Sequence, residues 1–186
     1  MFLMVDNYDS FTYNLVALFR LNGAKVDVIR NTEFKSANEY KGIILSPGPS
    51  NPANSGSTLE YLDKYAGRIP IFGVCLGMQS IGHHLGYEVR KANSVMHGKT
   101  DVIRLTQPSK LMDGVKDGFT SVRYHSLAVS APEKLITAKA ESDGECMAIE
   151  DDEKLLYGVQ FHPESILSEH GGIMVKNFMK ICGEGK

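Results

Sequence analysis

The sequence predicts an α/β fold: a single domain, residues 1–186, with a central, mostly parallel sheet, helices on both faces and added antiparallel strands. Short apolar runs alternate with helix-like segments through the first half of the chain, which is typical of β-α-β units. The second half holds short extended candidates separated by turn residues, which favours antiparallel strands. No repeat, low-complexity tract or linker interrupts the chain, so a single domain is the simplest arrangement.

The elements of the first half are predicted from their apolar patterns and from the residues that end them. Ser10 or Asp9 is expected to cap the first helix, which Asn22-Gly23 ends, because short polar side chains accept hydrogen bonds from free backbone N–H groups. The expected strands are apolar or β-branched runs: Phe2–Val5, Lys25–Ile29, Gly42–Leu45 and Ile69–Val74. The later expected helices are Thr58–Tyr65 and Leu76–Leu85.

The second half is predicted as short strands followed by one helix. Three segments near the expected site, around Gly48, Met96–Lys99 and Arg123–Leu127, are placed on long, irregular connections. The last helix, Gly172–Ile181, has an apolar face. The expected strands are Val102–Leu105, Thr120–Tyr124, Ala128–Val129, Ile136–Ala140, Met147–Ile149 and Leu156–Phe161.

Composition excludes several classes of protein. Lys plus Arg total 20 against 22 Asp plus Glu, with no basic block, so no nucleic-acid partner is expected. The longest apolar runs are far too short to cross a bilayer, and the first residues do not resemble a secretory signal. The three cysteines form no C-x-x-C pair, which argues against a zinc or redox site. We therefore expect a cytoplasmic protein that uses no metal.

The segment around Cys75 has the form of a nucleophile elbow. An apolar strand runs into Gly73-Val74-Cys75-Leu76-Gly77, and a helix follows at once. Glycines permit the sharp turn, and the start of the helix favours a thiolate at an exposed Cys75 Sγ. The amide of Leu76 would point to where an oxyanion forms. The alternative is that Cys75 is a small buried apolar residue.

Two further segments could complete such a site. His162 ends an apolar strand, and because side chains two apart in an extended chain share a side, Glu164 could orient its imidazole. The loop Ser46–Ser50 follows the strand Gly42–Leu45, at the strand end where α/β proteins place their sites. Gly48 in that loop could donate an amide to an oxyanion. Taken alone, a histidine after a strand is more often an ordinary surface residue, and the Ser46–Ser50 loop is more simply explained as a plain Pro-Gly turn.

Taken together, these segments resemble the class I glutamine amidotransferases. The resemblance rests on three motifs and spans nearly the whole chain: Ser46-Pro47-Gly48-Pro49, Gly73–Gln79 and Gln160-Phe161-His162-Pro163-Glu164. Within that class, Asp6–Leu15 is similar to the small subunit of anthranilate synthase and equally to the amidotransferase subunit of aminodeoxychorismate synthase. The segments Met96–Lys99 and Arg123–Leu127 match the same group.

The resemblance assigns a role to each site residue. It implies Cys75 as the nucleophile, His162 as the general base and acid, and Glu164 as the carboxylate that orients it. It implies oxyanion amides from Gly48 and Leu76. It also implies that the amino-acid end of glutamine is held by Gln79 and the backbone of Ser126 and Leu127, while His125 supports the loop. No organic cofactor is implied.

The resemblance also implies a partner, a large chorismate-binding synthase subunit that receives the ammonia, with the Asp6–Ser10 corner facing it. Anthranilate synthase, and hence tryptophan biosynthesis, is the main expectation. The amidotransferase subunit of aminodeoxychorismate synthase, in folate biosynthesis, is the first alternative. A free-standing γ-glutamyl cysteine hydrolase and a regulatory module without activity are the others. The Asp6–Leu15 segment speaks against a nucleotide acceptor such as that of GMP synthase.

Overall fold

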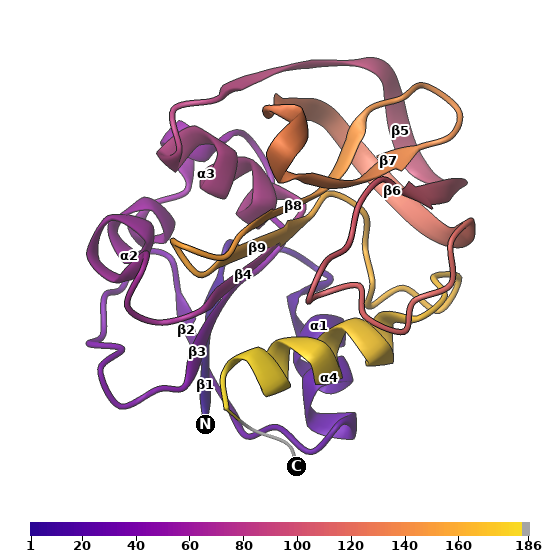
Figure 1. Ribbon diagram of the computed structural model, residues 1–186. Helices are drawn as coiled ribbons and strands as arrows, with labels where there is room; N and C mark the ends of the chain where they lie inside the picture. The colour runs from indigo at the N-terminus through magenta and orange to yellow at the C-terminus, as the bar shows by residue number, and fades with distance from the viewer. Residues whose placement is uncertain (184–186) are drawn as a thin grey trace.

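The computed structural model describes residues 1–183, within which nine strands form one mixed sheet in the order β2-β1-β3-β4-β9-β8-β7-β5-β6 (Figure 1). The first five strands in this order pair in parallel. The parallel strands are β1 Phe2–Asp6, β2 Val26–Arg30, β3 Gly42–Leu45, β4 Ile71–Val74 and β9 Leu156–Val159. The others are antiparallel: β5 Glu88–Leu105, β6 Phe119–Ser130, β7 Ile136–Ala140 and β8 Cys146–Asp151.

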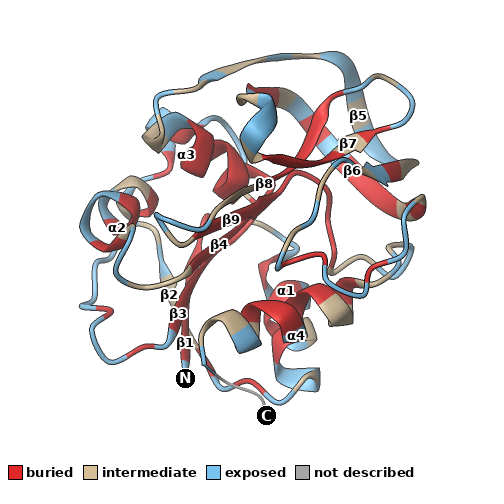
Figure 2. Cartoon of the chain, in the orientation of Figure 1, coloured by how far each residue is buried: buried red, intermediate tan, exposed pale blue. Residues whose placement is uncertain are grey.

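Helices cover both faces of the parallel half, as the sequence predicts. Within residues 1–183 the α-helices are α1 Thr12–Leu21, α2 Ser57–Tyr65, α3 Leu76–His84 and α4 Gly171–Ile181, and Pro52–Asn54 and Glu133–Leu135 form short 3-10 turns. Alternate strand side chains point to opposite faces, so β1 sends Phe2 and Met4 towards α1 and α4, and Leu3 and Val5 towards α2 and α3. Figure 2 shows the resulting two buried layers on either side of the central strands.

The carboxyl ends of the parallel strands meet at one edge of the sheet, where α/β folds place their sites. The residues that follow β1, β3 and β4 at this edge are Asn7, Ser46 and Cys75, and His162 lies three residues beyond β9. Segments far apart in the sequence are therefore brought to the same place. Within residues 1–183, none of the helices has the length and apolar character that a bilayer crossing requires.

Two of the predicted irregular connections are strands instead. Met96–Lys99 lies in β5, which is 18 residues long, and Arg123–Leu127 lies in β6. These strands pair with each other over most of their length, so the ladder satisfies most of their backbone groups, although the register breaks between Lys91 and Met96. Most side chains of β5 before Val102 are exposed or half-buried, which explains why no apolar alternation marked the strand in the sequence. Of the three segments expected on irregular connections, only the Gly48 loop is one.

The start of α1 also differs from the prediction. The residue before the helix is Phe11, whose side chain makes no capping hydrogen bond, and Ser10 caps nothing. The Asp9 carboxylate accepts the Phe11 N–H at 2.7 Å, and Asp6 accepts the Tyr8 N–H and the Thr12 hydroxyl. The turn that leads into α1 is therefore fixed by two carboxylates, because a carboxylate accepts several N–H bonds at once and a serine hydroxyl fewer.

Candidate active site

Cys75 lies in a strained turn between β4 and α3. Its backbone has φ 53° and ψ −105°, a region that non-glycine residues rarely adopt, and its N–H donates to Val159 O at 2.8 Å. The flanking glycines make the turn possible. A Cβ on Gly73 would lie 2.4 Å from the Gly77 carbonyl carbon, and one on Gly77 would lie 2.4 Å from Leu45 O. The predicted elbow geometry is therefore confirmed.

Cys75 is recessed, with 6% of its surface exposed, so the expectation of an exposed thiol is wrong. It lies instead at the meeting point of two cavities. One, of about 150 Å³, is lined by residues that include Gly48, Cys75, Gln79, Ser126 and Leu127. The other, of about 340 Å³, is lined by residues that include Gly48, Cys75 and His162. Neighbouring residues therefore cover most of Cys75, but the residue still lines two cavities that a small molecule could enter.

His162 and Glu164 form the expected pair. His162 Nδ1 lies 2.6 Å from Glu164 Oε1, and both side chains are almost completely buried. The buried Nε2 on the other side of the ring has no hydrogen-bond partner within residues 1–183. Burial opposes a charged imidazole, but the Cys75 side chain and the Glu164 carboxylate outweigh it and raise the pKa of His162 above its ordinary value. The geometry therefore favours an imidazolium beside the thiol.

The Gly48 loop is held against the elbow. A Cβ on Gly48 would lie 2.7 Å from the Leu76 side chain and 2.5 Å from the Asn7 Cβ, so only glycine fits. Among the described residues, neither the Gly48 nor the Leu76 N–H has an acceptor. Gly48 lines both cavities and Leu76 directly follows Cys75, where the two cavities meet, so both backbone donors are available to a ligand oxygen.

Asn7 is a site residue that the sequence analysis missed. Its backbone N–H donates to Ser46 Oγ at 2.8 Å, and its side-chain amide donates to Ser46 O at 2.9 Å. Its side-chain oxygen Oδ1 accepts hydrogen bonds from the side-chain amide of Asn31 and the hydroxyl of Thr58. Asn7 therefore fastens the Gly48 loop to the end of β1. The sequence offered one signal for this residue, because Asn7 directly follows the buried strand β1, at the strand end where α/β proteins place their sites.

Gln79 lies on α3, close to the strand that carries Ser126 and Leu127. Its amide Nε2 donates to Leu127 O at 3.3 Å and to Gln160 Oε1 at 3.1 Å. Gln79, Ser126 and Leu127 line the smaller cavity together with Cys75. The structure thus brings together the residues predicted for glutamine, except that Leu76, whose side chain lies against Gly48, lines neither cavity.

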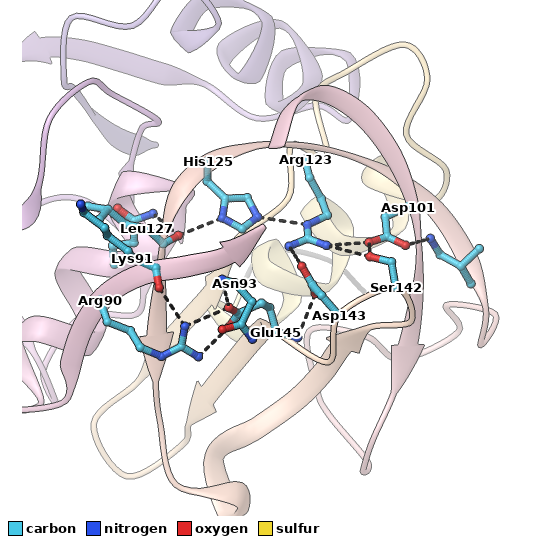
Figure 3. Close-up of polar contacts among 12 residues, drawn as sticks. Arg90, Lys91, Asn93, Asp101, Arg123, His125, Leu127, Ser142, Asp143 and Glu145 are labelled. Carbon is cyan, nitrogen blue, oxygen red and sulfur yellow. Dashed lines mark hydrogen bonds and ion pairs between the residues drawn. The ribbon is translucent and has the colours of Figure 1, made fainter. Parts of the chain in front are cut away.

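A buried polar cluster supports this strand (Figure 3). Arg123 is fully buried and donates to Asp101 at 2.6 Å and to Asp143 at 2.9 Å. Its Nε–H donates to His125 Nε2 at 3.1 Å, and His125 Nδ1 lies 2.8 Å from Leu127 O. Burial lowers the pKa of His125 to about 4. The expectation that His125 supports its own segment is met by these contacts.

We expect His125 to make the protein less stable in acid. The unfolded chain binds a proton at this ring below about pH 6.5, whereas the folded protein resists until about pH 4, so stability falls as the pH drops through that range. Between pH 7 and pH 5 the loss from this group is about 2 kcal/mol. Urea unfolding at both pH values measures it, with His125→Asn as the comparison. An equal pH dependence in both proteins would contradict the prediction.

Comparisons with known proteins agree with this geometry. The family described as "Glutamine amidotransferase class-I" matches residues 3–182. The chain is 44% identical to anthranilate synthase component 2 of Pseudomonas aeruginosa, covering all of both chains. It is 43% identical to aminodeoxychorismate/anthranilate synthase component 2 of Bacillus subtilis, covering 97% of this chain and 96% of the relative.

A solved structure shows the same fold. A Thermoplasma acidophilum protein, described as a putative subunit of GMP synthase, superposes with a TM-score of 0.88, at 24% identity, over 98% of this chain and 93% of its own. At 24% identity this similarity supports only a shared fold. The family match and the two full-length relatives are similarities of sequence. Together with the strained cysteine turn and the His–Glu pair, they show that the chain belongs to the class-I glutamine amidotransferase family.

Proposed function

We propose that the chain, residues 1–186 as one amidotransferase domain, is a cytoplasmic glutaminase subunit that passes ammonia to a chorismate-using synthase subunit. The acceptor enzyme proposed first is anthranilate synthase, in tryptophan biosynthesis. The observation that carries the proposal is the strained Cys75 at a cavity it shares with the Glu164-paired His162. Family membership supports glutamine as the substrate.

In the proposed reaction Cys75 is the nucleophile. Its thiolate attacks the side-chain carboxamide carbon of glutamine and forms a C–S bond. The oxyanion that results accepts hydrogen bonds from the N–H groups of Gly48 and Leu76, which stabilise the transition state by about 3 kcal/mol per donor. No cofactor enters this step, because the thiolate, the amides and the imidazole supply its chemistry.

His162 moves the protons in both halves of the reaction. Its imidazolium donates a proton from Nε2 to the leaving nitrogen as the C–N bond breaks, and ammonia departs. A thioester between Cys75 and the glutamyl group remains. The now neutral His162 then accepts a proton from a water molecule that attacks the thioester carbon, which releases glutamate and restores the thiolate. Glu164 orients the ring through Nδ1 and stabilises its charged form.

The amino-acid end of glutamine is proposed to lie in the smaller cavity. Gln79, Ser126 and Leu127 line this cavity together with Cys75, which supports the proposal. The β5–β6 register breaks between Lys91 and Met96, opposite Ser126, so ladder pairing is interrupted there. This position is therefore suited to hydrogen bonds with a substrate.

The proposed partner is a separate chorismate-using subunit. Both relatives compared above are named component 2 of a synthase. Large apolar side chains are also exposed beside the site: Phe11 and Tyr124 line the cavity at His162, and Ile166 and Leu167 follow Glu164 closely in the chain. Exposed apolar groups around a cavity are typical of a surface that another protein covers.

A second acceptor is supported by one specific observation. The Bacillus subtilis relative is named for both the aminodeoxychorismate and the anthranilate enzyme. We therefore keep the amidotransferase subunit of aminodeoxychorismate synthase as the second candidate. Identification of the product made by the assembled complex distinguishes the two.

The partner proposal predicts weak glutaminase activity in the isolated chain. Binding of the large subunit is expected to raise the rate at least tenfold, and chorismate to raise it further, because docking covers the cavity and excludes bulk water from the site. The measurement is glutamate release while purified large subunit is titrated against this chain. A flat response at saturating binding, confirmed by an independent binding assay, would favour the free-standing hydrolase.

A further inference from the structure

One backbone carbonyl links the buried cluster to the proposed glutamine pocket. Leu127 O accepts hydrogen bonds from His125 Nδ1 at 2.8 Å and from Gln79 Nε2 at 3.3 Å. Both of its lone pairs are thus used by protein donors. The orientation of this peptide group is therefore set jointly by Gln79 and by His125, whose contact with Leu127 is drawn in Figure 3.

The tautomer of His125 follows from its neighbour. A guanidinium has only N–H donors, so Arg123 Nε–H requires His125 Nε2 to be the acceptor. The single proton of the neutral ring must then lie on Nδ1, which makes the ring a donor to Leu127 O. The lowered pKa of His125 keeps the ring neutral at physiological pH. Asp101 and Asp143 hold Arg123 in place, so the ring cannot turn over without breaking this cluster.

The orientation of the Gln79 amide follows in turn. A carbonyl can only accept, so Gln79 must present its NH₂ group to Leu127 O, and the second N–H of that group goes to Gln160 Oε1. Both donors are then committed. The polar atom that remains is the acceptor Oε1 of Gln79, at the cavity that contains Cys75.

We propose that His125 is a positioning residue for glutamine: through the Leu127 carbonyl it fixes which atom of Gln79 faces the substrate. The inference rests on the proposed function, because it takes Gln79 and the Ser126–Leu127 backbone as the site of the amino-acid end. His125 also lines the smaller cavity, but both of its ring nitrogens are committed, one to Arg123 and one to Leu127 O, so the ring offers no hydrogen bond to the substrate. Its loss therefore weakens the recognition of glutamine without removing the thiol's reactivity.

Two electrophiles that alkylate Cys75 separate these effects. A diazoketone analogue of glutamine must bind by its amino-acid end, whereas iodoacetamide needs only the thiol. For His125→Leu we expect the concentration of diazoketone at half-maximal labelling rate to rise about tenfold, the effect of losing one hydrogen bond. The rate of labelling by iodoacetamide is expected to stay within about twofold.

Rescue and control variants exclude a general structural effect. His125→Asn keeps a side-chain N–H near the position of Nδ1 and is expected to restore most of the half-maximal concentration. Asn177→Leu is the matched control, since Asn177 is also buried and donates to two backbone carbonyls, Leu111 O and Asp113 O, outside the pocket. It is expected to lower stability without changing the half-maximal concentration. If urea unfolding shows that His125→Leu does not fold, His125→Gln, whose amide extends beyond the Nδ1 position, takes its place.

The outcomes are decisive and separate this inference from the proposed function. An unchanged half-maximal concentration in His125→Leu would overturn the inference, and so would an equal rise in Asn177→Leu or in His125→Asn. If the wild-type chain reacts with iodoacetamide but is not saturated by the diazoketone, the proposed glutamine site itself fails. A selective rise in His125→Leu, reversed in His125→Asn, supports both.

Discussion

Cys75→Ser is expected to lower glutamine hydrolysis at least about a thousandfold, because a hydroxyl is a far weaker nucleophile than a thiolate at neutral pH. The serine side chain fits the elbow, since it is smaller than cysteine and the strained backbone is unchanged. The protein should therefore fold and bind its partner normally. Glutamate release by the assembled complex measures the loss.

Two controls make this result specific. Cys182→Ser changes a half-buried cysteine in the turn that ends α4, which lines neither of the two cavities at Cys75, and is expected to leave the rate unchanged. The Cys75→Ser complex should also still form product from ammonium salts, because the synthase step does not use the thiol. Appreciable glutaminase activity in Cys75→Ser would end the proposed role of this residue.

His162→Ala is expected to reduce glutaminase activity almost as much, since it removes both proton transfers. The fold-loss of glutaminase activity in Glu164→Gln should be tens of times smaller than in His162→Ala, because substitution of a residue that orients a catalytic base generally lowers the rate less than substitution of the base itself. Glutamine keeps the size of the buried side chain but loses the charge that favours the imidazolium. The measurements are kcat and the pH profile of each variant complex.

The dependence of the rate on pH is expected to change in a definite direction in Glu164→Gln. The active acid is the imidazolium, so the rate falls on the alkaline side as His162 loses its proton. The Cys75 side chain and the Glu164 carboxylate raise the pKa of His162. Replacing the Glu164 carboxylate by the neutral amide of glutamine therefore lowers this pKa. The alkaline limb should therefore move to lower pH in Glu164→Gln. If Glu164→Gln proved more damaging than His162→Ala, their roles would have to be exchanged.

The parallel half of the fold and the elbow were predictable because local patterns reported them. Strands buried on both faces, such as β3 and β4, read as continuous apolar runs. The Gly-x-Cys-x-Gly spacing predicted a tight turn, which the φ of 53° at Cys75 confirms. The pairing of His162 with Glu164 followed from the two-residue period of an extended chain.

Most of β5 and the centre of β6 were missed because their stability does not come from a local pattern. Glu88–Thr100 pairs with β6 while most of its side chains meet solvent, so its strand conformation depends on a partner segment some thirty residues away. The Ser10 cap was wrong for a related reason. Asp6 and Asp9 already bind the backbone of that turn, and their geometry depends on where β1 ends.

The sequence by itself determined the chemistry of this protein: a cysteine on a strand-to-helix turn, a histidine with a carboxylate two residues away and a glycine loop after a buried strand. Only the tertiary structure decided how these parts are held. Asn7 fastens the Gly48 loop from the neighbouring strand, and Arg123 fixes the His125 tautomer through residues distant in the chain. The physical reason is that reactive groups are specified by local residue types and spacing, whereas their orientation depends on hydrogen bonds that exist only after the sheet has assembled.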